Sequence, residues 1–279
     1  MGGYDMSGAV DAINLRTMRS KAAVAVYAVG ERLQPREAAA LQSVLARVRG
    51  QPILDLGVGA GRTAKPLLAV SSDYLGIDYS PEMVAHCRAR YPNVRFEHGD
   101  ARELRSLAAG SFGLVVFSCN GICMVAHDDR LKILREALRV LKPGGVLLFT
   151  TYNQDCDDEL GAFKFPEFAL SANPVRLGVR AMRFVAAALV RARNWLRYRK
   201  HNLRTAEYSM INDVCHDYGT MLYYISLPNQ RRQLEACGFE RGAVAFDHAG
   251  KRIETPNREN DYSIVAFKPM AGPMAGLAG

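Results

Sequence analysis

Between residues 52 and 142, short apolar runs alternate with polar stretches of helical character, and this alternation limits the fold more than any other feature. The runs are dense in β-branched and apolar residues, as is typical of strands buried on both faces of a sheet. Parallel strands joined by crossover helices produce this alternation, so it predicts an α/β fold with a doubly wound, mostly parallel sheet. The expected strands are 52–56, 74–77, 94–97, 114–117 and 146–151, and the expected helices are 35–49, 80–90 and 130–141.

Capping residues predict where two of these helices begin and end. Ser80 followed by Pro81 is typical of an N-cap with proline in the first helical position. Asp128 or Asp129 is expected to cap the helix at 130–141. The sequence Pro143-Gly144-Gly145 then ends it.

The alternation stops after the fifth strand and resumes near residue 227. Two alternating runs around 213–219 predict an antiparallel pair. A helix at 228–237 and strands at 242–246 and 262–267 bring the predicted sheet to seven strands. We therefore expect a helical cap at 1–50, a core at 51–154, an inserted α+β lid with a basic helix at 155–226, the end of the core sheet at 227–268 and a flexible tail at 269–279.

The positive charge of the chain is concentrated in the insertion. The formal net charge is +8, yet residues 161–204 hold ten lysines or arginines and one acid, Glu167. The remainder carries 26 bases and 27 acids, so it has no general preference for anions. No apolar run approaches the roughly 20 residues of a membrane-spanning helix, and the first residues lack the pattern of a secretory signal. We expect a cytoplasmic protein. Because the six cysteines include no C-x-x-C pair, no metal site is expected.

A glycine-rich loop follows the first strand, in the sequence Leu54-Asp55-Leu56-Gly57-Val58-Gly59-Ala60-Gly61-Arg62. Glycines allow a tight turn and let a ligand approach the main chain closely. A dinucleotide fingerprint counted from Gly57 needs a glycine where Arg62 stands, and no Walker-type lysine follows. Asp55 suits a cationic amino-acid moiety, whereas it would oppose a pyrophosphate.

Two further acids end the next two strands. Asp78 follows the second strand, where a carboxylate can accept both hydroxyls of a ribose. Asp100 follows the third strand, near the expected place of an adenine amino group. The carboxyl ends of parallel strands share one edge of the sheet, so Asp55, Asp78 and Asp100 are expected to converge on one crevice.

With these motifs the chain resembles the class I S-adenosylmethionine-dependent methyltransferases of the small-molecule type. The resemblance covers residues 51–153, 234–239 and the last strand, and the run from Leu138 to Gly145 is a second match. It implies a Rossmann-like methyltransferase fold with S-adenosyl-L-methionine as the cofactor. The cofactor-binding residues that it implies are Tyr27, Asp55, Gly57, Gly59, Gly61, Asp78, Tyr79, Met83, Asp100, Ala101, Ser118 and Cys119.

The resemblance also assigns roles within this set. Asp55 and the three glycines would line the methionine moiety, bordered by Ser118 and Cys119 at the end of the fourth strand. Asp78 would hold the ribose, Asp100 and Ala101 the adenine, and Tyr79 and Met83 would pack on the adenosine. Tyr27 would close over the cofactor from the N-terminal segment, or else pack within that segment.

The sequence offers candidate bases for methyl transfer without choosing between them. A neutral amine or a carboxylate attacks a sulfonium methyl directly, whereas an alcohol or phenol must also lose a proton. His216 is the best-placed candidate, since Asp213 and Asp217 flank it and could orient it, although turn residues of this kind also serve as solvated caps. His127 suits a structural role, because its neighbours suit helix capping.

Several acceptor classes are disfavoured. Enzymes for exocyclic base amines usually carry Asn/Asp-Pro-Pro-Tyr/Phe where this chain reads Ser118-Cys119-Asn120-Gly121, and neither a Pro-Cys nucleophile nor a C-x-x-x-C-x-x-C cluster occurs. We expect methyl transfer to oxygen or nitrogen of a small metabolite or of a sugar or glycan intermediate, with nucleic acid disfavoured as a partner. An RNA methyltransferase using the basic insertion, and a non-catalytic cofactor-binding regulator, are the alternatives. Residues 175–204 leave peripheral membrane contact open, and a homodimer is also open.

Overall fold

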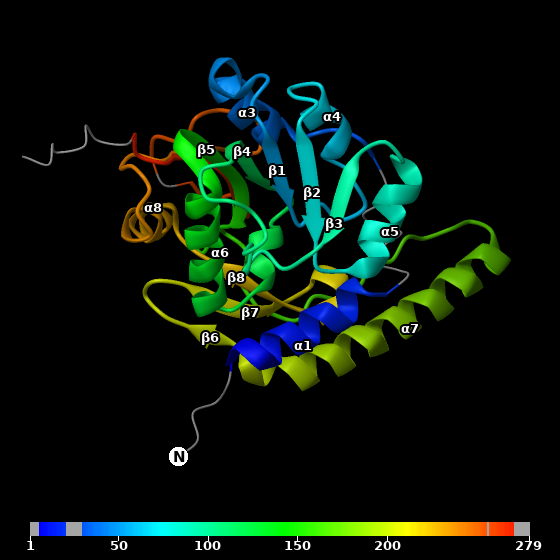
Figure 1. Ribbon diagram of the computed structural model, residues 1–279. Coiled ribbons are helices and arrows are strands. Elements are labelled where there is room, and N and C mark those ends of the chain that lie inside the picture. The colour runs from blue at the N-terminus through cyan, green and yellow to red at the C-terminus, as the bar shows by residue number, and fades with distance from the viewer. Residues whose placement is uncertain (1–5, 21–29, 256, 271–279) are drawn as a thin grey trace, which may run out of the picture.

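The computed structural model describes residues 6–20, 30–255 and 257–270 of the 279-residue chain, and five parallel strands lie at its centre (Figure 1). Their order is β3-β2-β1-β4-β5, and each strand is parallel to its neighbours. The sheet therefore extends in both directions from β1, which places a crevice at the carboxyl ends of β1 and β4. The bounds are β1 (Ile53–Leu56), β2 (Tyr74–Asp78), β3 (Arg95–His98), β4 (Phe112–Phe117) and β5 (Leu141–Tyr152).

Two further strands complete the core sheet beside β5. Strand β10 (Asp261–Phe267) pairs antiparallel with β5 along seven residues, and β9 (Val244–Phe246) pairs antiparallel with β10. The seven core strands confirm the predicted doubly wound, mostly parallel α/β sheet.

Helices cover both faces of this sheet. Apolar residues of α3 (Pro35–Val48), α4 (Ala64–Leu68) and α5 (Pro81–Arg90) pack on one face, in a cluster that includes Ile53 of β1. Residues of α1 (Met6–Met18), α6 (His127–Val140) and α8 (Leu227–Ala236) pack on the other face, with Leu54 and Leu56. Alternate side chains of β1 thus enter opposite cores, as the pleat of a strand requires.

The predicted start of α5 is confirmed, but that of α6 is wrong. The Ser80 side chain accepts a hydrogen bond from the Met83 N–H, and Pro81 is the first helical residue. Helix α6 instead begins at His127, and its N-cap Ala126 has no side-chain cap. Asp128 and Asp129 lie in the first turn, and the buried Asp129 carboxylate is engaged by Arg102 and Lys132. The Asp129 carboxylate forms these ion pairs and does not cap the helix.

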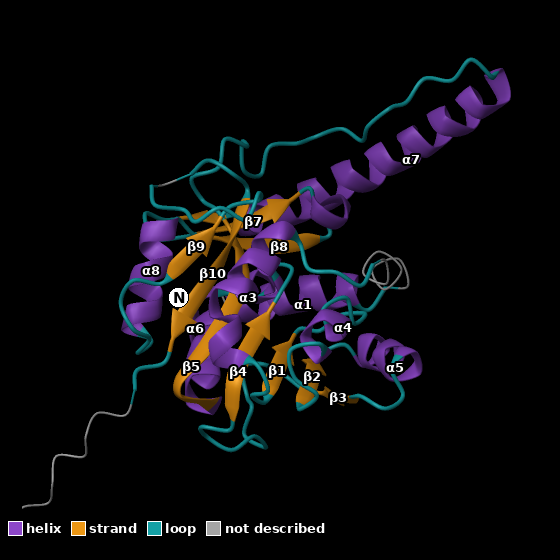
Figure 2. Cartoon of the chain, turned by 90° about the horizontal axis from the view of Figure 1, so that it is seen from above, coloured by secondary structure: helices purple, strands orange, loops and turns teal. Residues whose placement is uncertain are grey.

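The insertion forms three antiparallel strands and one long helix. The antiparallel pair predicted around 213–219 is confirmed as β7 and β8, and β8 continues the core sheet through one pair, Tyr224 beside Tyr152 of β5. Helix α7 projects away from the rest of the molecule (Figure 2). The bounds are α7 (Pro174–Tyr198), η2 (Arg199–His201), β6 (Leu203–Arg204), β7 (Ser209–Asp213), η3 (Cys215–Tyr218) and β8 (Thr220–Tyr224).

Helix α1 fastens this insertion to the core. The Asn14 side chain donates to the Met221 carbonyl at 2.9 Å and accepts from the Met221 N–H at 2.8 Å. It also donates to the carbonyl of Met124, in η1 (Gly121–Met124), at 2.6 Å. One buried amide thus joins α1, η1 and β8 next to the crevice.

Candidate functional site

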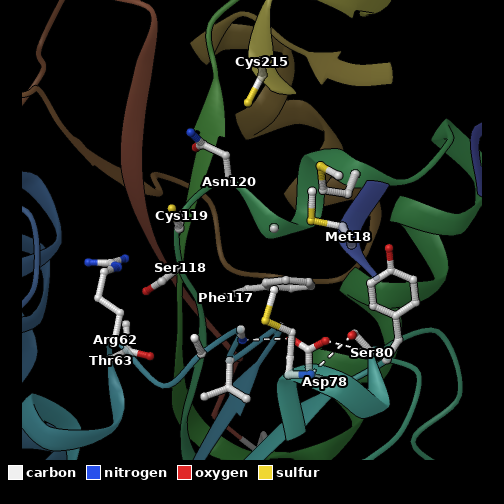
Figure 3. A pocket seen from close by; sticks show the side chains of 18 of the residues that line it. Met18, Arg62, Thr63, Asp78, Ser80, Phe117, Ser118, Cys119, Asn120 and Cys215 are labelled. Carbon is white, nitrogen blue, oxygen red and sulfur yellow. Dashed lines mark hydrogen bonds between the residues drawn. The ribbon is translucent and has the colours of Figure 1, made fainter. Parts of the chain in front are cut away.

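Two adjoining cavities lie at the carboxyl ends of the central strands. The larger encloses about 870 Å³ and the smaller about 490 Å³. Six residues line both, so the two cavities are lobes of one crevice, and Figure 3 shows the larger lobe. The shared residues are Gly57, Asp78, Tyr79, Phe117, Gly121 and Met124.

The glycine loop forms one wall of the larger lobe. Gly57, Gly59 and Gly61 have φ angles of +60°, +56° and +85°, a region that disfavours other residues. A Cβ on Gly57 would lie 2.4 Å from the Phe117 ring, so glycine is required for this close packing. At Gly59 a Cβ would meet no neighbouring atom within 4 Å, which leaves the backbone open to a ligand.

Asp78 lies at the junction of the two lobes. Its carboxylate accepts the Gly59 N–H at 2.8 Å and the Ser80 N–H at 2.8 Å, which ties the end of β2 to the glycine loop (Figure 3). Burial raises the pKa of this carboxyl, against the effect of these hydrogen bonds. A carboxylate has about four acceptor positions, and the backbone N–H groups of Gly59, Ser80 and Tyr79 leave part of this capacity for a ligand.

Asp55 and Gly61 lie behind the cavity wall instead of on it. Asp55 is fully buried, and it accepts hydrogen bonds from the hydroxyls of Thr63 at 2.5 Å and Tyr74 at 2.8 Å. Burial raises the pKa of this carboxyl to about 6. A Cβ on Gly61 would pack 3.1 Å from Tyr91, away from the lobes. Both residues support the loop from below, and their contact with a ligand stays a prediction; Asp55 Oδ1 is buried, and the described residues offer it no hydrogen-bond partner.

The smaller lobe contains Asp100 and Ala101. Arg102 binds the Asp100 carboxylate at 2.7 Å and Asp129 at 3.0 Å, and it also pairs with Asp11 of α1. The Asp100 carboxylate is therefore oriented by a charged partner at the edge of the lobe. A ligand amino group that binds Asp100 shares it with Arg102.

A strained turn follows β4. Cys119 and Asn120 have φ angles of +53° and +56°, a left-handed region that asparagine tolerates but that is unfavourable for cysteine and is often found at functional sites. The Asn120 backbone N–H donates to the Thr150 hydroxyl at 2.5 Å, and the Asn120 side-chain amide donates to the Asp261 carboxylate at 2.9 Å. Ser118, Cys119 and Asn120 all line the larger lobe.

Comparisons with known proteins point to the same residues. A family model described as a methyltransferase domain matches residues 53–145. An arsenite methyltransferase of Aquipseudomonas alcaligenes is 37% identical over 120 residues, which cover 38% of this chain and 34% of that protein. A demethylmenaquinone methyltransferase of Renibacterium salmoninarum is 33% identical over 129 residues, covering 46% and 52%.

The fold agrees with a solved structure as well. The crystal structure of an S-adenosylmethionine-dependent methyltransferase from Clostridium acetobutylicum matches with a TM-score of 0.56, over 84% of this chain and 91% of that chain, at 14% identity. This chain contains a methyltransferase domain at residues 53–145, and its fold is that of S-adenosylmethionine-dependent methyltransferases. It spans between about a third and a half of the length of the two relatives above.

The crevice of the methyltransferase domain has features that fit its family's cofactor. Ser118 Oγ and Asn120 Oδ1 are buried, and the described residues offer neither atom a hydrogen-bond partner. Buried polar atoms are rarely left unpaired, so these two fit a polar ligand such as an amino-acid moiety. Together with the open backbone at Gly59 and the carboxylate of Asp78, they suit the polar parts of S-adenosylmethionine.

The insertion, expected as a lid, supplies two residues at the far end of the larger lobe, and α1 and β5 supply two more. Met18 of α1, Tyr152 at the end of β5, Cys215 of η3 and Leu222 of β8 all line it. Burial raises the pKa of the Tyr152 hydroxyl, which keeps it neutral. Periodicity assigned these positions to strands and turns, but no local signal placed them at the crevice.

Neither His216 nor His127 lines the two lobes. His216 lies in η3 with a φ of +50° and is outside the residues that line the two lobes. Its neighbour Asp217 accepts from Arg191 of α7 at 2.7 Å. His127 stacks on Tyr208 with ring centres 4.3 Å apart and bonds the Tyr223 hydroxyl at 2.8 Å, as suits a structural role.

The remaining predicted residues are Tyr79, Met83 and Tyr27. Tyr79 lines both lobes and Met83 lines the larger one. Tyr27 falls outside the described residues. Residues that the sequence interpretation missed include Arg62, whose guanidinium forms two 2.8 Å bonds with the buried carboxylate of Glu37 at the edge of the lobe.

Proposed function

We propose that this chain transfers a methyl group from S-adenosylmethionine to an oxygen or nitrogen atom of a small metabolite or of a sugar or glycan intermediate. The observation that carries the proposal is the two-lobed crevice, in which Asp78 stands at the junction and the insertion lines one end. The relatives named for methylation of arsenite and demethylmenaquinone support a small-molecule acceptor.

The cofactor spans the two lobes, and each lobe binds a different part of it. Asp78 holds the ribose at the junction, while Asp100 and Ala101 hold the adenine in the smaller lobe. The open backbone at Gly59, together with Ser118, holds the methionine moiety in the larger lobe. Tyr79 borders both lobes, where its ring packs on the adenosine.

The larger lobe sets the class of acceptor. It comprises about 870 Å³, part of which is open to solvent, and the methionine moiety shares this space with the acceptor; a space of this size suits a small molecule. Met18, Met124 and Leu222 make its far end apolar, and the hydroxyl of Tyr152 and the amide of Asn120 add polar groups. An acceptor with an apolar body and one nucleophilic oxygen or nitrogen matches this lining.

Catalysis by this lobe rests on orientation. Bound S-adenosylmethionine supplies an activated methyl group on a sulfonium, and the acceptor atom must lie in line with it. Holding two reactants in such a geometry lowers a barrier by roughly 7–11 kcal/mol. An alcohol acceptor also needs a base, and His216 is the proposed one: it does not line the lobe itself, but its neighbour Cys215 in η3 does, and burial lowers the pKa of His216, so the ring is neutral and able to accept a proton.

A transfer screen tests the proposal. The wild-type chain is incubated with S-adenosylmethionine carrying a tritiated methyl group and with separate pools of metabolites, glycans and RNA. We expect labelling of a component in the metabolite or glycan pool, loss of that labelling in Asp78→Asn, and its retention in Asp73→Asn. Asp73 is an exposed acid just ahead of β2, at the opposite end of the strand from the crevice, and it serves as the matched control.

The other outcomes separate the alternatives. Labelling of RNA alone contradicts the small-molecule proposal. Binding of the cofactor without labelling of any pool supports a regulatory role in place of transfer. Equal labelling by wild type and Asp78→Asn removes Asp78 from the proposed site.

A further inference from the structure

Helix α7 is long and exposed along its whole length. It has 25 residues, beginning after the N-cap Asn173, and none of them is buried. Apolar side chains recur on it every three or four residues and therefore share one face. Large exposed apolar patches on a protein surface usually mark an interaction site. We call this set the apolar face; it consists of Val175, Val179, Met182, Val185 and Leu189.

The apolar face is turned away from the contacts that hold the helix. Val175, Met182 and Leu189 are 74%, 67% and 67% exposed. The opposite side of α7 carries Phe184, whose ring packs edge-on against Phe168 at 5.4 Å. In the view of Figure 2 the helix and the segment that precedes it extend together beyond the rest of the molecule.

Polar contacts fix the carboxyl-terminal end of α7 to other segments of the insertion. Arg191 pairs with Asp217 at 2.7 Å, and Asn194 donates to the Asp217 carbonyl at 2.9 Å. The Trp195 indole donates to the Gly161 carbonyl at 2.9 Å. The helix is therefore held at one end, while its amino-terminal turns extend outward with the apolar face uncovered.

The charge around the apolar face is of one sign. Residues 175–204 contain nine arginines and lysines and no acid. Arg176, Arg180 and Arg183 follow one another along the flank of the apolar face. In the described part of the chain, Arg191 is the one arginine of α7 that pairs with an acidic side chain.

The apolar face and the positive charge around it together indicate what binds there. Two copies of α7 packed together would bring their arginines close without a single acid from either helix, which is unfavourable. A helix with an apolar face and flanking arginines matches the interface of an anionic bilayer, where apolar side chains enter the acyl boundary and arginines meet the headgroups. Among the described residues, no helix has the length and apolarity to cross a bilayer.

We propose that α7 binds the surface of an anionic membrane through the apolar face and its flanking arginines. Helix α7 lies on the side of the molecule toward which the parallel strands point their carboxyl ends (Figure 1). It also contacts η3, whose Cys215 lines the larger lobe. In the membrane-bound orientation, the side of the protein that carries the crevice therefore faces the lipid. The proposal is independent of methyl transfer.

Vesicle flotation tests the proposal with the full chain. Wild-type protein is mixed with vesicles of phosphatidylcholine alone or with 30% phosphatidylglycerol, at low and at moderate salt. We expect flotation with the anionic vesicles at low salt, weaker flotation at moderate salt, and at least about ten-fold less binding to neutral vesicles, because electrostatic attraction is screened by salt. Absence of flotation at low salt overturns the proposal.

Two sets of variants separate the charge from the apolar face. The triple variant Arg176→Gln/Arg183→Gln/Arg193→Gln should bind anionic vesicles at least about ten-fold more weakly. Its matched control, Arg105→Gln/Arg241→Gln/Arg252→Gln, removes the same charge from exposed sites elsewhere and should bind within about two-fold of wild type. Equal losses in both triples would mean that overall charge, and not α7, directs binding.

The apolar face is tested by Met182→Gln/Leu189→Gln, which leaves the charge of α7 unchanged. Both side chains are exposed, so the fold is retained, which far-UV circular dichroism and thermal unfolding check. We expect this variant to remain unbound even at low salt. A wild-type dimer in light scattering that this variant converts to a monomer, without flotation of the wild type, identifies a second copy as the occupant and overturns the membrane proposal.

Discussion

The carboxylate of Asp78 accepts the backbone N–H of Gly59 at 2.8 Å, and this bond joins the end of β2 to the glycine loop. The same carboxylate accepts the Ser80 N–H at the start of α5. One side chain thus sets the relative positions of three segments that surround the crevice. Its remaining acceptor positions face the junction of the two lobes, where the ribose hydroxyls are proposed to bind.

Asp78→Asn should weaken binding of S-adenosylhomocysteine by about 10- to 100-fold. The amide retains one acceptor oxygen but loses the charge, and hydrogen bonds to charged groups contribute roughly 1.5–3 kcal/mol each. Isothermal titration calorimetry measures the effect, with Asp73→Asn as the control. Unchanged affinity in Asp78→Asn would show that the carboxylate does not meet the ligand.

Asp55→Asn should change how stability depends on pH. The carboxyl is fully buried, and its pKa of about 6 in the folded chain lies above its ordinary value. An acid whose pKa is raised by folding contributes stability below its unfolded pKa, and this contribution is lost as pH rises through the folded pKa. Between pH 4 and pH 7 the wild type should lose about 2 kcal/mol of unfolding free energy from this group.

Asp55→Asn lacks that titration, so it should gain stability relative to wild type as pH rises from 4 to 7. Urea unfolding at several pH values measures the difference. Parallel pH profiles for the two proteins would contradict the raised pKa.

The position of Asp55 shows where sequence interpretation reaches its limit. The motif correctly located the glycine loop and Asp78, because a strand followed by glycines places both at one edge of the sheet. The side chains of a strand alternate between faces, and Asp55 shares its face with Ile53, which packs under α3 and α4. The motif does not state which face each residue occupies, so it could not indicate that Asp55 lies behind the wall of the crevice and supports the loop.

Arg130→Met should destabilise the fold by about 3 kcal/mol or more. The guanidinium is completely buried and donates to Gln233 at 3.0 Å, Thr151 at 3.1 Å, Gln230 at 2.6 Å and the Ile122 carbonyl at 3.1 Å. Removing it leaves several buried acceptors without donors, at roughly 1–3 kcal/mol each.

Chemical denaturation of the methionine variant measures this loss. Arg135→Met, at an exposed position of the same helix, is the control and should stay within about 0.5 kcal/mol of wild type. Equal stability of the two variants would mean that the buried network contributes little.

His216→Asn should lower turnover of an identified alcohol acceptor by about 100-fold or more while leaving cofactor affinity unchanged. A general base contributes roughly 10²- to 10⁴-fold. Turnover and S-adenosylhomocysteine affinity are measured in parallel, with His201→Asn as the control on the same insertion. Equal turnover in His216→Asn and wild type would eliminate His216 as the base.

The contribution of the insertion to the crevice depends on long-range packing. Cys215 and Leu222 reach the lobe because β8 continues the sheet beside Tyr152 and because Asn14 binds Met221. These contacts join residues that are 72 and 207 positions apart. The alternating pattern predicted the antiparallel pair from local sequence, but it carried no information about what the pair packs against.

The most direct measurement compares two glycine substitutions in calorimetric titration with S-adenosylhomocysteine. Gly59 and Gly50 both have positive φ angles and open space around the position of a Cβ, so alanine imposes a similar backbone strain at each, of about 1–2 kcal/mol. Only Gly59 lines the crevice. We predict that wild type and Gly50→Ala bind the ligand with similar affinity and that Gly59→Ala binds at least about ten-fold more weakly, since its methyl group occupies the space where the ligand approaches the backbone. No binding by the wild type, or equal affinity of the two alanine variants, would contradict the proposed cofactor site.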